Sequence, residues 1–484
     1  MWPVVSKHYS AAREVYKLFP TANFKKVCAL CSGAPTNDAR AEAPTRRYES
    51  RPDLKPPTVE ILKRTRGASP GYIFIAPKKE VVQAGPLILD NRGRVVWFLP
   101  LNTHGVTDFR MQRYRGRPVL TWWHGQPDKG SGKSGKSGYS IYDDSYRFLT
   151  SVQAGNGMSP DIHEFKITPQ NTALITTSRE IRVKGRRVLE GGVQEVDIKT
   201  GRVLFDWRSI DHVRLVESYY HLPRDPGRIF DYFHVNSVET DHDGNLIVSA
   251  RNTHTIYKID RRTGKVLWRL GGKRSDFTLG RAARFAWQHD ARRRPDGALT
   301  LFDNSAGPQV RKQSRGLVLR LDLKRMHAAV ARTFVHRPPI VSVDQANLQR
   351  LPGGHYFIGW GHQPRFTEFG PRGTILFDGR FGRGRVDSYR AYRLPWRGRP
   401  LREAFAVAVR ARNVYVSWNG ATEVSSWQVL QGPRKTELRP VRTAAKTGFE
   451  TRIPLGGDAA GWIVVRALDR RERALGRSTA VNLG

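Results

Sequence analysis

Short segments in which apolar and polar residues alternate recur along most of the chain, separated by turn residues. One clear example runs from Phe285 to Asn304, with Pro295-Asp296-Gly297 between its two extended segments. Proline presets φ and glycine accepts positive φ, so this tripeptide favours a tight turn. The alternation has the period of two that is typical of β-strands. The pattern therefore predicts an all-β protein built from hairpins.

The same hairpin plan recurs, and each copy begins with a polar residue. The polar residues at the head of four copies are His163, His234, His289 and Asn347, which are 71, 55 and 58 residues apart. A weaker copy covers Phe109–Trp123. Scattered surface histidines would not recur in phase with a repeat, so we expect these positions to be structurally equivalent.

A second family of hairpins alternates with the first. Its six copies are Pro86–Phe98, Tyr139–Val152, Val193–Trp207, Ile256–Leu270, Leu317–Phe334 and Phe366–Gly379. Two alternating hairpin families at such intervals are typical of four-stranded sheets arranged radially. The repeat predicts a six-bladed β-propeller over residues 58–395. Equivalent positions of the innermost strands then converge at one mouth of the central channel, and we expect the polar heads to face one another there.

The rhythm changes after Pro395. Six short segments with strand character follow, namely Ala404–Arg410, Asn413–Trp418, Glu423–Gln431, Leu438–Thr443, Phe449–Pro454 and Trp462–Leu468. This spacing predicts a small β-sandwich over residues 396–484, and its second and third segments resemble strands of a fibronectin type III domain. A seventh blade is the alternative, but the region lacks a polar head. Residues 1–57 are expected to form a disordered or short helical arm.

The charge is strongly positive, with 82 Lys and Arg against 43 Asp and Glu, a net charge of +39. Three interpretations remain open: a solvated basic surface, attraction of small anions to a positive funnel, and nucleic-acid binding. The last ranks lowest, because no recognition helix, zinc finger or RNP-type motif accompanies the charge. We therefore expect no nucleic-acid partner.

Two short motifs do not indicate a cofactor. Cys28 and Cys31 form a C-x-x-C without the βαβ context of a redox pair or the two further ligands of a zinc site, so we expect an incidental pair. Gly130–Ser137 has the spelling of a phosphate-binding loop, but a strand follows where that loop requires a helix. We expect no metal, cofactor or nucleotide. The sequence shows no signal peptide and no transmembrane segment, which leaves a cytoplasmic location open.

Two segments, Asp231–Gly272 and Phe285–Asn304, contain the motifs F-H-x-N-S, S-A-R and W-Q-H-D-A. Over about residues 60–395 the chain resembles the arylsulfotransferase family, in the branch common in actinobacteria and fungi. The resemblance implies a six-bladed propeller that moves a sulfuryl group from a phenolic sulfate ester to a phenol. It further implies a histidine intermediate, no nucleotide sulfate donor, and an extracellular or cell-envelope location. The family's N-terminal β-sandwich is missing here, which leaves the oligomeric state and the choice of donor open.

The resemblance assigns roles to individual residues. His289, in W-Q-H-D-A, corresponds to the nucleophile. The residues predicted to line the sulfuryl site are His234, Asn236 and Arg251 by motif, and His163 and Asn347 by repeat position. No metal ligand is implied.

These residue types suit sulfuryl transfer, which resembles phosphoryl transfer in being served by positioning and cationic donors. A neutral imidazole is a nucleophile near neutral pH, and the fork of Arg251 fits two oxygens. His234 or His163, when protonated, would stabilise the oxygens and give a proton to the departing phenoxide. We expect Asp290 to be structural, because neighbours in a strand alternate between faces.

Other interpretations are weighed beside this one. A single strand-head histidine more often bonds a backbone carbonyl, whereas three in phase with an arginine favour a site. Asp303 and Asn304 are expected to close a turn, and Arg315 to reach the channel or form a surface salt bridge. A noncatalytic propeller scaffold that binds a protein remains the alternative function. A quinone-dependent dehydrogenase is excluded by the repeat count and the lack of an acidic cluster for calcium.

Overall fold

The computed structural model describes residues 43–101, 105–125, 137–456 and 460–483. Of the predicted N-terminal arm, 1–57, only residues 43–57 are described, and there Ala43 and Leu54 are buried. Cys28 and Cys31 lie outside the described residues, as does most of the Gly130–Ser137 loop. The regular elements of the described residues are strands and four 3-10 helices, which confirms the all-β prediction.

Three sheets occupy the first half of the described chain, each antiparallel along its main path. The first contains β2 (Tyr72–Ile75), β3 (Leu87–Leu89) and β4 (Val95–Phe98), together with β27 (Tyr392–Leu394) from much later in the chain. The second contains β5 (Val106–Tyr114), β6 (Arg117–His124), β7 (Gly138–Tyr142) and β8 (Phe148–Val152). The third contains β9 (Ser159–Ile167), β10 (Thr172–Val183), β11 (Arg186–Asp197) and β12 (Val203–Arg208), with the short β13 (Phe230–Asp231) beside β11.

Three further sheets follow with the same order. The fourth contains β14 (Val235–Thr240), β15 (Leu246–Ala250), β16 (Thr255–Ile259) and β17 (Val266–Gly271). The fifth contains β19 (His289–Arg293), β20 (Leu299–Asp303), β21 (Arg315–Asp322) and β22 (His327–Phe334), with β18 (Thr278–Leu279) beside β22. The sixth contains β23 (Asn347–Arg350), β24 (Tyr356–Gly359), β25 (Arg365–Phe369) and β26 (Ile375–Phe381), with β1 (Val59–Arg64) at its outer edge. The 3-10 helices are η1 (Ser209–Asp211), η2 (Leu215–Glu217), η3 (Pro352–Gly354) and η4 (Arg402–Ala404).

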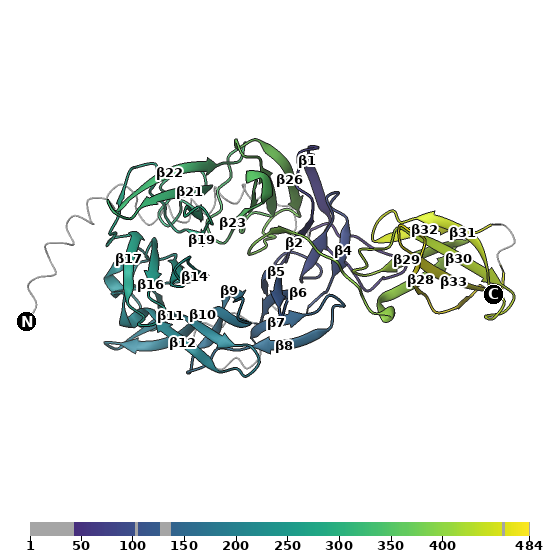
Figure 1. The fold of residues 1–484 in the computed structure, drawn as a ribbon, viewed down its shortest axis with the longest axis horizontal. Coiled ribbons are helices and arrows are strands. Elements are labelled where there is room, and N and C mark those ends of the chain that lie inside the picture. Colours follow the sequence, from purple (N-terminus) through teal and green to yellow (C-terminus); the bar gives the residue numbers. More distant parts are fainter. Residues whose placement is uncertain (1–42, 102–104, 126–136, 457–459, 484) are drawn as a thin grey trace, which may run out of the picture. The chain divides into compact units, whose positions relative to one another are not determined.

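These sheets are arranged around a common centre in a propeller-like manner (Figure 1). The first strands of successive sheets contact one another, β5 with β9, β9 with β14, β14 with β19 and β19 with β23. The two ends of this region interlock, because β1 pairs with β26 and β27 pairs with β2. Pairing of this kind leaves fewer exposed strand edges.

Apolar residues of neighbouring sheets pack against each other and form the core. Trp207, Val248 and Tyr257 belong to one buried cluster that joins the third and fourth sheets. Leu270, Leu299 and other residues join the fourth and fifth in the same way. Because full burial of a large apolar side chain contributes about 1.5–3 kcal/mol, this inter-sheet packing holds the inner strands in fixed positions.

The innermost strands share a local irregularity. The register shifts between Thr107 and Arg110 in β5, between Val235 and Ser237 in β14, and between His289 and Arg292 in β19. Such β-bulges place an extra residue in one strand and re-aim the side chains beside it. The bulges occur where the strands begin, next to the polar heads predicted from the repeat.

The region after Pro395 forms two antiparallel sheets that share one core. One sheet contains β28 (Phe405–Arg410), β29 (Asn413–Trp418) and β32 (Glu450–Pro454). The other contains β30 (Ser426–Gly432), β31 (Arg439–Ala445), β33 (Trp462–Leu468), β34 (Ala474–Arg477) and β35 (Val481–Asn482). Val416, Trp427 and Val465 are buried in their common core.

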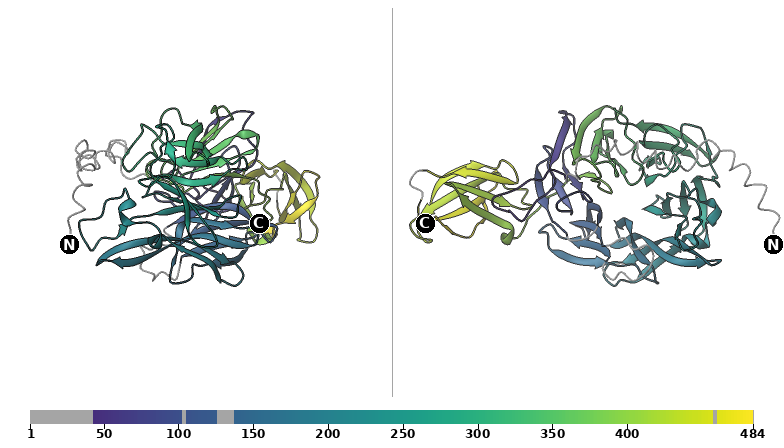
Figure 2. Two further views of the ribbon diagram at one scale, coloured as in Figure 1. Left: turned by 60° about the vertical axis from the view of Figure 1, so that its left-hand side comes forward. Right: turned by 180° about the vertical axis from the view of Figure 1, so that it is seen from behind.

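This C-terminal region packs beside the first sheet (Figure 2). The side chain of Asn419 accepts a hydrogen bond from the Phe98 N–H (3.1 Å) and donates one to the Phe98 carbonyl (2.9 Å). Tyr146 donates to the carbonyl of Gly420 (2.8 Å). A Cβ at Gly420 would lie 2.2 Å from the Tyr146 ring, and its φ is +93°, so only glycine fits there.

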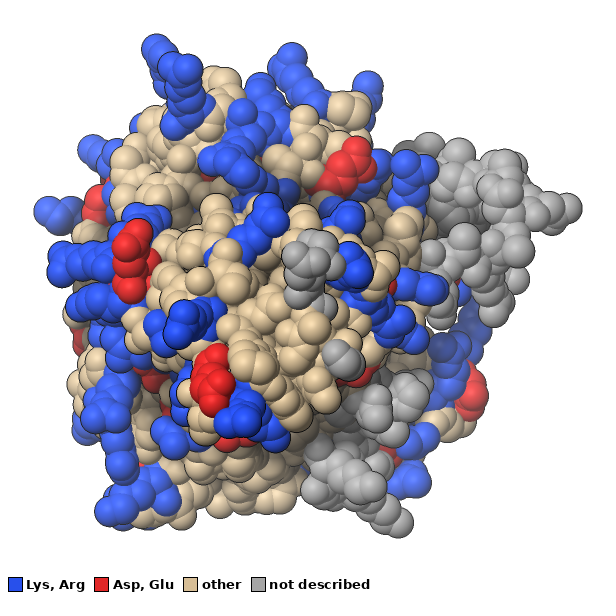
Figure 3. Space-filling model, turned by 90° about the vertical axis from the view of Figure 1, so that its right-hand side faces the viewer, with Lys and Arg blue, Asp and Glu red and all other residues tan. Residues whose placement is uncertain are grey.

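Basic side chains are distributed over the surface. On the face shown in Figure 3, Lys and Arg are scattered among uncharged residues, with Asp and Glu between them. The charge is therefore not gathered into one continuous patch on this face. Among the described residues, no helix has the length and apolar character that a membrane crossing requires.

Candidate functional site

The three predicted histidines lie on inner strands, His163 in the middle of β9 and the other two where their strands begin. The ring centroids of His163, in β9, and His234, directly before β14, are 4.8 Å apart. The φ of +56° at His234 belongs to the irregular entry into β14. Arg251, directly after β15, donates its backbone N–H to the carbonyl of His234 (2.9 Å). His289 starts β19, and the charges of Arg251, His163 and His234 each lower its pKa.

The hydrogen bonds around His289 determine which ring nitrogen carries the proton. Its Nδ1 lies 2.7 Å from Oδ1 of Asn304 and 3.1 Å from the carbonyl of Trp287. The amide of Asn304 cannot be reversed, because its Nδ2 donates to the carbonyls of Ser342 (2.8 Å) and Gln345 (3.1 Å). Both partners of Nδ1 are therefore acceptors, so Nδ1 carries the hydrogen. Nε2 keeps its lone pair, and the Gln345 N–H lies 3.3 Å from it.

The environment of His289 also keeps the ring neutral. Burial lowers the pKa of His289 well below its usual value, and the nearby charge of Arg251 lowers this pKa further. The bond to Asn304 acts in the opposite direction and is the smaller effect. His289 is thus a buried, neutral imidazole whose unprotonated Nε2 accepts one long hydrogen bond, from the Gln345 N–H (3.3 Å), and an unprotonated ring nitrogen is what a nucleophile requires.

His163 and His234 have a different partner on Nδ1. Nδ1 of His163 bonds to Asp161, and Nδ1 of His234 bonds to Asp231. A carboxylate in this position orients the ring and stabilises the imidazolium. Burial and the charge of Arg251 lower the pKa of His234, whereas Asp231 raises it.

The guanidinium of Arg251 contacts the protein through one face and through its Nε. Its plane lies over the ring of Trp287, 4.5 Å from the centroid, and its Nε donates to Oδ1 of Asn252 (3.0 Å). Within the described residues, its two terminal nitrogens have no hydrogen-bond partner. They form the planar fork that binds two oxygens of an anion. Burial lowers the pKa of Arg251, and Asp231 and Asp344 partly offset this.

The two predicted asparagines lie in different settings. Asn236 is fully buried and donates from Nδ2 to the carbonyl of Gln288 (2.7 Å), while its Oδ1 has no partner among the described residues. Both polar atoms of the Asn347 side chain bond to the backbone of Ala391, at 2.9 and 3.0 Å. The polar atoms of the Asn347 side chain are thus already hydrogen-bonded within the protein, and contact of Asn347 with substrate stays a prediction.

Behind the histidines, a cluster of buried charges lies at the centre of the ring. Arg390 contacts Asp108 of β5 (2.8 Å), Glu164 of β9 (3.2 Å), Asp290 of β19 (3.7 Å) and the carbonyl of Asn236 in β14 (2.9 Å). The side chains of Arg390, Asp108 and Glu164 are fully buried. A buried charge requires such compensation. One arginine therefore joins strands from four sheets.

Asp290 has the structural role expected of it. Its carboxylate accepts hydrogen bonds from the backbone of Leu348 (3.0 Å) and from Arg292 (2.7 Å). Arg292 in turn contacts Glu164 (2.5 Å). Glu164 and Asp290, which follow His163 and His289 in their strands, thus belong to the charged cluster rather than to the histidine site.

Two expectations need correction. Asn304 does not simply close a turn, because its side chain bonds to His289 (2.7 Å). Arg315 neither reaches the histidines nor lies on the surface; it is buried and pairs with Asp303 (2.8 Å). Asp303 does brace a turn, since it accepts from the backbone of Ala286 (3.1 Å) and Ser305 (3.0 Å).

Sequence reasoning missed three further groups at the site. The ring of Tyr389 lies 5.4 Å from that of His163 between centroids. Asp344 and His362 form an ion pair close to Gln345. None of these residues occupies a repeat-equivalent head position or a recognised motif.

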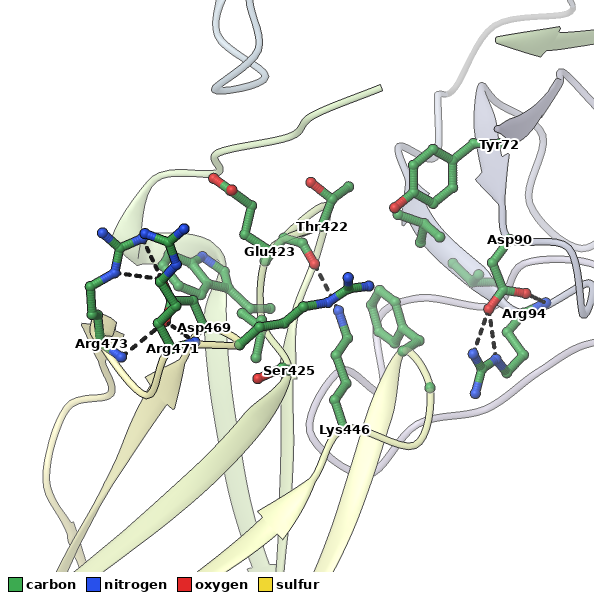
Figure 4. A pocket seen from close by; sticks show the side chains of 18 residues that line it. Tyr72, Asp90, Arg94, Thr422, Glu423, Ser425, Lys446, Asp469, Arg471 and Arg473 are labelled. Atoms are coloured by element: carbon green, nitrogen blue, oxygen red, sulfur yellow. Dashed lines mark hydrogen bonds and ion pairs between the residues drawn. The ribbon is translucent and has the colours of Figure 1, made fainter. Parts of the chain in front are cut away.

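A pocket of about 610 Å³ lies elsewhere, between the first sheet and the C-terminal sheets (Figure 4). Its charged lining is largely paired, Arg94 with Asp90 (2.7 Å) and Arg473 with Asp469 (2.8 Å). It contains none of the predicted site residues. Among the described residues, no group of three or more His, Cys, Asp or Glu is arranged to hold a metal ion.

Comparison with known proteins places the site within a matched region. The family model for arylsulfotransferase (ASST) matches residues 110–382, which include His163, His234, Arg251 and His289. No curated protein sequence matches the chain.

Several solved structures are similar at low sequence identity. A protein of unknown function from Bacteroides caccae is 14% identical, with 67% of this chain and 98% of that chain covered and a TM-score of 0.41. A catalytically inactive virginiamycin B lyase from Staphylococcus aureus is 8% identical, with 75% and 96% covered and a TM-score of 0.34. Likeness at this level carries no information on function.

Proposed function

The chain belongs to the arylsulfotransferase family, and from this membership and the geometry around His289 we propose that it transfers a sulfuryl group from a phenolic sulfate ester to a phenol through a sulfohistidine. The observation that carries the proposal is the neutral His289, with its hydrogen on Nδ1 and its lone pair on Nε2, and with the charge of Arg251 near enough to lower its pKa. Family membership implies small aryl substrates. The reaction needs no nucleotide sulfate donor in this proposal.

Binding of the sulfate ester is the first step. The terminal nitrogens of Arg251 take two of the three sulfuryl oxygens, and His234 and His163, in their protonated forms, donate from Nε2 to the third. The aspartates on Nδ1 of both histidines keep these rings oriented toward the oxygens. Because the charge on the oxygens is greatest in the transition state, fixed donors lower the barrier, and loss of one typically costs about 2.7–4 kcal/mol.

Two in-line displacements follow. In the first, Nε2 of His289 attacks sulfur, the bond from sulfur to the phenol oxygen breaks, and its electron pair leaves with the phenoxide. In the second, the oxygen of an acceptor phenol attacks sulfur, the N–S bond breaks, and its electron pair returns to Nε2. The transferred group is never released to water, so the acceptor phenol is essential for turnover.

The finer architecture belongs to the same proposal. We assign residues 58–395 to a six-bladed β-propeller and residues 396–484 to a fibronectin type III-like β-sandwich, preceded by an arm over residues 1–57. The repeated four-strand order and the interlocked ends support the first assignment. The two sheets around one core support the second. An extracellular or cell-envelope location is inferred from the family.

The test uses a fluorogenic aryl sulfate with and without a phenol acceptor. We expect turnover that requires the phenol and is lost in His289→Ala, while His327→Gln, an exposed histidine at the start of β22, leaves it unchanged. Turnover with water alone would indicate a sulfatase. No turnover with any aryl sulfate would favour the alternative of a noncatalytic scaffold that binds a protein.

A further inference from the structure

Asp344 and His362 form a carboxylate–imidazole pair that is more exposed than the three histidines of the site. Nδ1 of His362 lies 3.3 Å from Oδ1 of Asp344. Their side chains are 36% and 34% exposed, compared with 7% and 17% for His163 and His234, while His289 as a whole is 1% exposed. The pair is therefore more accessible to a phenol from solvent than the three histidines are.

The pair is connected to the reacting nitrogen through one residue. The backbone N–H of Gln345 lies 3.3 Å from Nε2 of His289, and the side chain of Gln345 donates to Asp344 (3.2 Å). The turn that carries His362 is pressed against this segment, because a Cβ at Gly361 would lie 2.4 Å from the nitrogen of Ala346. Gly361 also has a φ of +58°, so a larger residue is excluded on both grounds.

The charges around the pair keep Asp344 ionised. Burial alone would raise the pKa of Asp344, but the hydrogen bond and charge of His362, with Arg251 and His289, lower it overall. Lys78 is a further cation within electrostatic reach. In the proposal, an ionised Asp344, 3.3 Å from Nδ1 of His362, attracts the Nδ1–H and leaves Nε2 of that ring to exchange a proton, as in other carboxylate–histidine pairs.

We propose that His362, oriented by Asp344, is the acid–base group that gives a proton to the departing phenoxide and takes one from the acceptor phenol. The inference rests on the proposed sulfuryl transfer and identifies a catalytic residue for it. In the first displacement, protonated His362 donates its Nε2 proton to the phenol oxygen as the S–O bond breaks. In the second, neutral His362 takes the proton of the acceptor phenol as the phenol oxygen attacks sulfur. His362 therefore returns to its starting protonation state after each cycle.

With this assignment the histidines have three separate roles: nucleophile, binding of a sulfuryl oxygen, and proton transfer. In-line displacement requires the phenol oxygen to lie opposite Nε2 of His289 across sulfur. His163 and His234, which are more buried, bind the remaining sulfuryl oxygen. A further group is needed for the phenol oxygen itself, and His362 is the more exposed imidazole. Since donor and acceptor phenols occupy the same place in turn, one group serves both displacements.

The experiment varies the acidity of the phenol in His362→Gln. Release of the first phenol is followed as a pre-steady-state burst, using 4-nitrophenyl sulfate and unsubstituted phenyl sulfate. A strongly acidic phenol leaves without a proton, so the burst with 4-nitrophenyl sulfate should match that of the unsubstituted enzyme. With phenyl sulfate it should slow by about 100-fold or more. Equal slowing of both donors, or no slowing of either, would overturn the assignment.

Acceptors give an independent readout. Turnover of His362→Gln should recover with phenols that are already ionised at the assay pH, and Asp344→Asn should show the same dependence more weakly. His355→Gln is the matched control, since His355 pairs with Glu368 (2.9 Å) at the opposite end of β24. A burst in the unsubstituted enzyme that His362→Gln leaves unaltered for every donor overturns this inference alone. The lack of any burst from the unsubstituted enzyme overturns the proposed function and this inference together.

Discussion

Replacing Asn304 by alanine tests whether the position of the proton on His289 matters. In the structure, Oδ1 of Asn304 is the nearer of two acceptors of the Nδ1–H, at 2.7 Å against 3.1 Å for the carbonyl of Trp287. Without Asn304 the hydrogen has only the weaker acceptor. A larger fraction of His289 then carries its hydrogen on Nε2, and that form cannot attack sulfur.

The size of the effect follows from the burial of the group. Loss of the partner of a buried N–H costs about 1–3 kcal/mol. One carbonyl remains within reach of the Nδ1–H, so the lower part of this range is the better expectation. Converted to a rate, about 1–2 kcal/mol should slow the first displacement roughly 5- to 30-fold in Asn304→Ala. The remaining acceptor is the reason why we do not expect complete loss.

The assay is the single-turnover release of phenol from an aryl sulfate at saturating donor. Ser314→Ala is a matched control, because the Ser314 hydroxyl donates to the carbonyls of Asn304 (2.8 Å) and Ser342 (3.3 Å) in the same buried cluster without contacting His289. Both variants should lose stability, and only Asn304→Ala should lose rate. A folded Asn304→Ala with an unchanged rate, or an equal loss in Ser314→Ala, would refute the argument.

Three further predictions concern other parts of the site. Burial lowers the pKa of His254 to about 3. Below about pH 6.5 the unfolded chain therefore binds a proton that the folded chain does not, and the free energy of unfolding decreases as the pH decreases. His254→Phe should reduce this pH dependence, measured in thermal melts across acidic pH. Arg390→Met leaves Asp108 and Glu164 without their buried cation and should cost about 3–5 kcal/mol, measured as the urea midpoint and slope. Arg251→Lys removes the planar fork and should lower kcat/KM by about 100-fold or more, measured with a fluorogenic aryl sulfate.

The repeat made part of the site predictable. His163, His234 and His289 recur on inner strands, and the period of the hairpins is sufficient to indicate that such positions meet. The structure does place His163 and His234 side by side, and it places Arg251 on the backbone of His234. A sequence repeat can predict such proximity because repeat-equivalent residues occupy equivalent positions in sheets that pack around a common centre.

Residues outside the repeat were not predictable in this way. Asn304 lies at the end of the second strand of its sheet, and Asp344 precedes the first strand of the next one, so no periodic position indicates them. Tyr389 and Arg390 belong to the segment that returns to the first sheet after the sixth. Their contacts with β5, β9 and β14 depend on how the ends interlock, which is a long-range property. Asn347 also has a repeat-equivalent position, but the polar atoms of its side chain bond to the backbone of Ala391, so its role at the site stays a prediction.

The ion cluster around Arg390 has a consequence for the rigidity of the ring. Arg390 contacts groups on the inner strands of four sheets, so none of these strands can shift without leaving a buried charge unpaired. In the proposed reaction, donor and acceptor phenols would therefore meet the same fixed frame in both displacements.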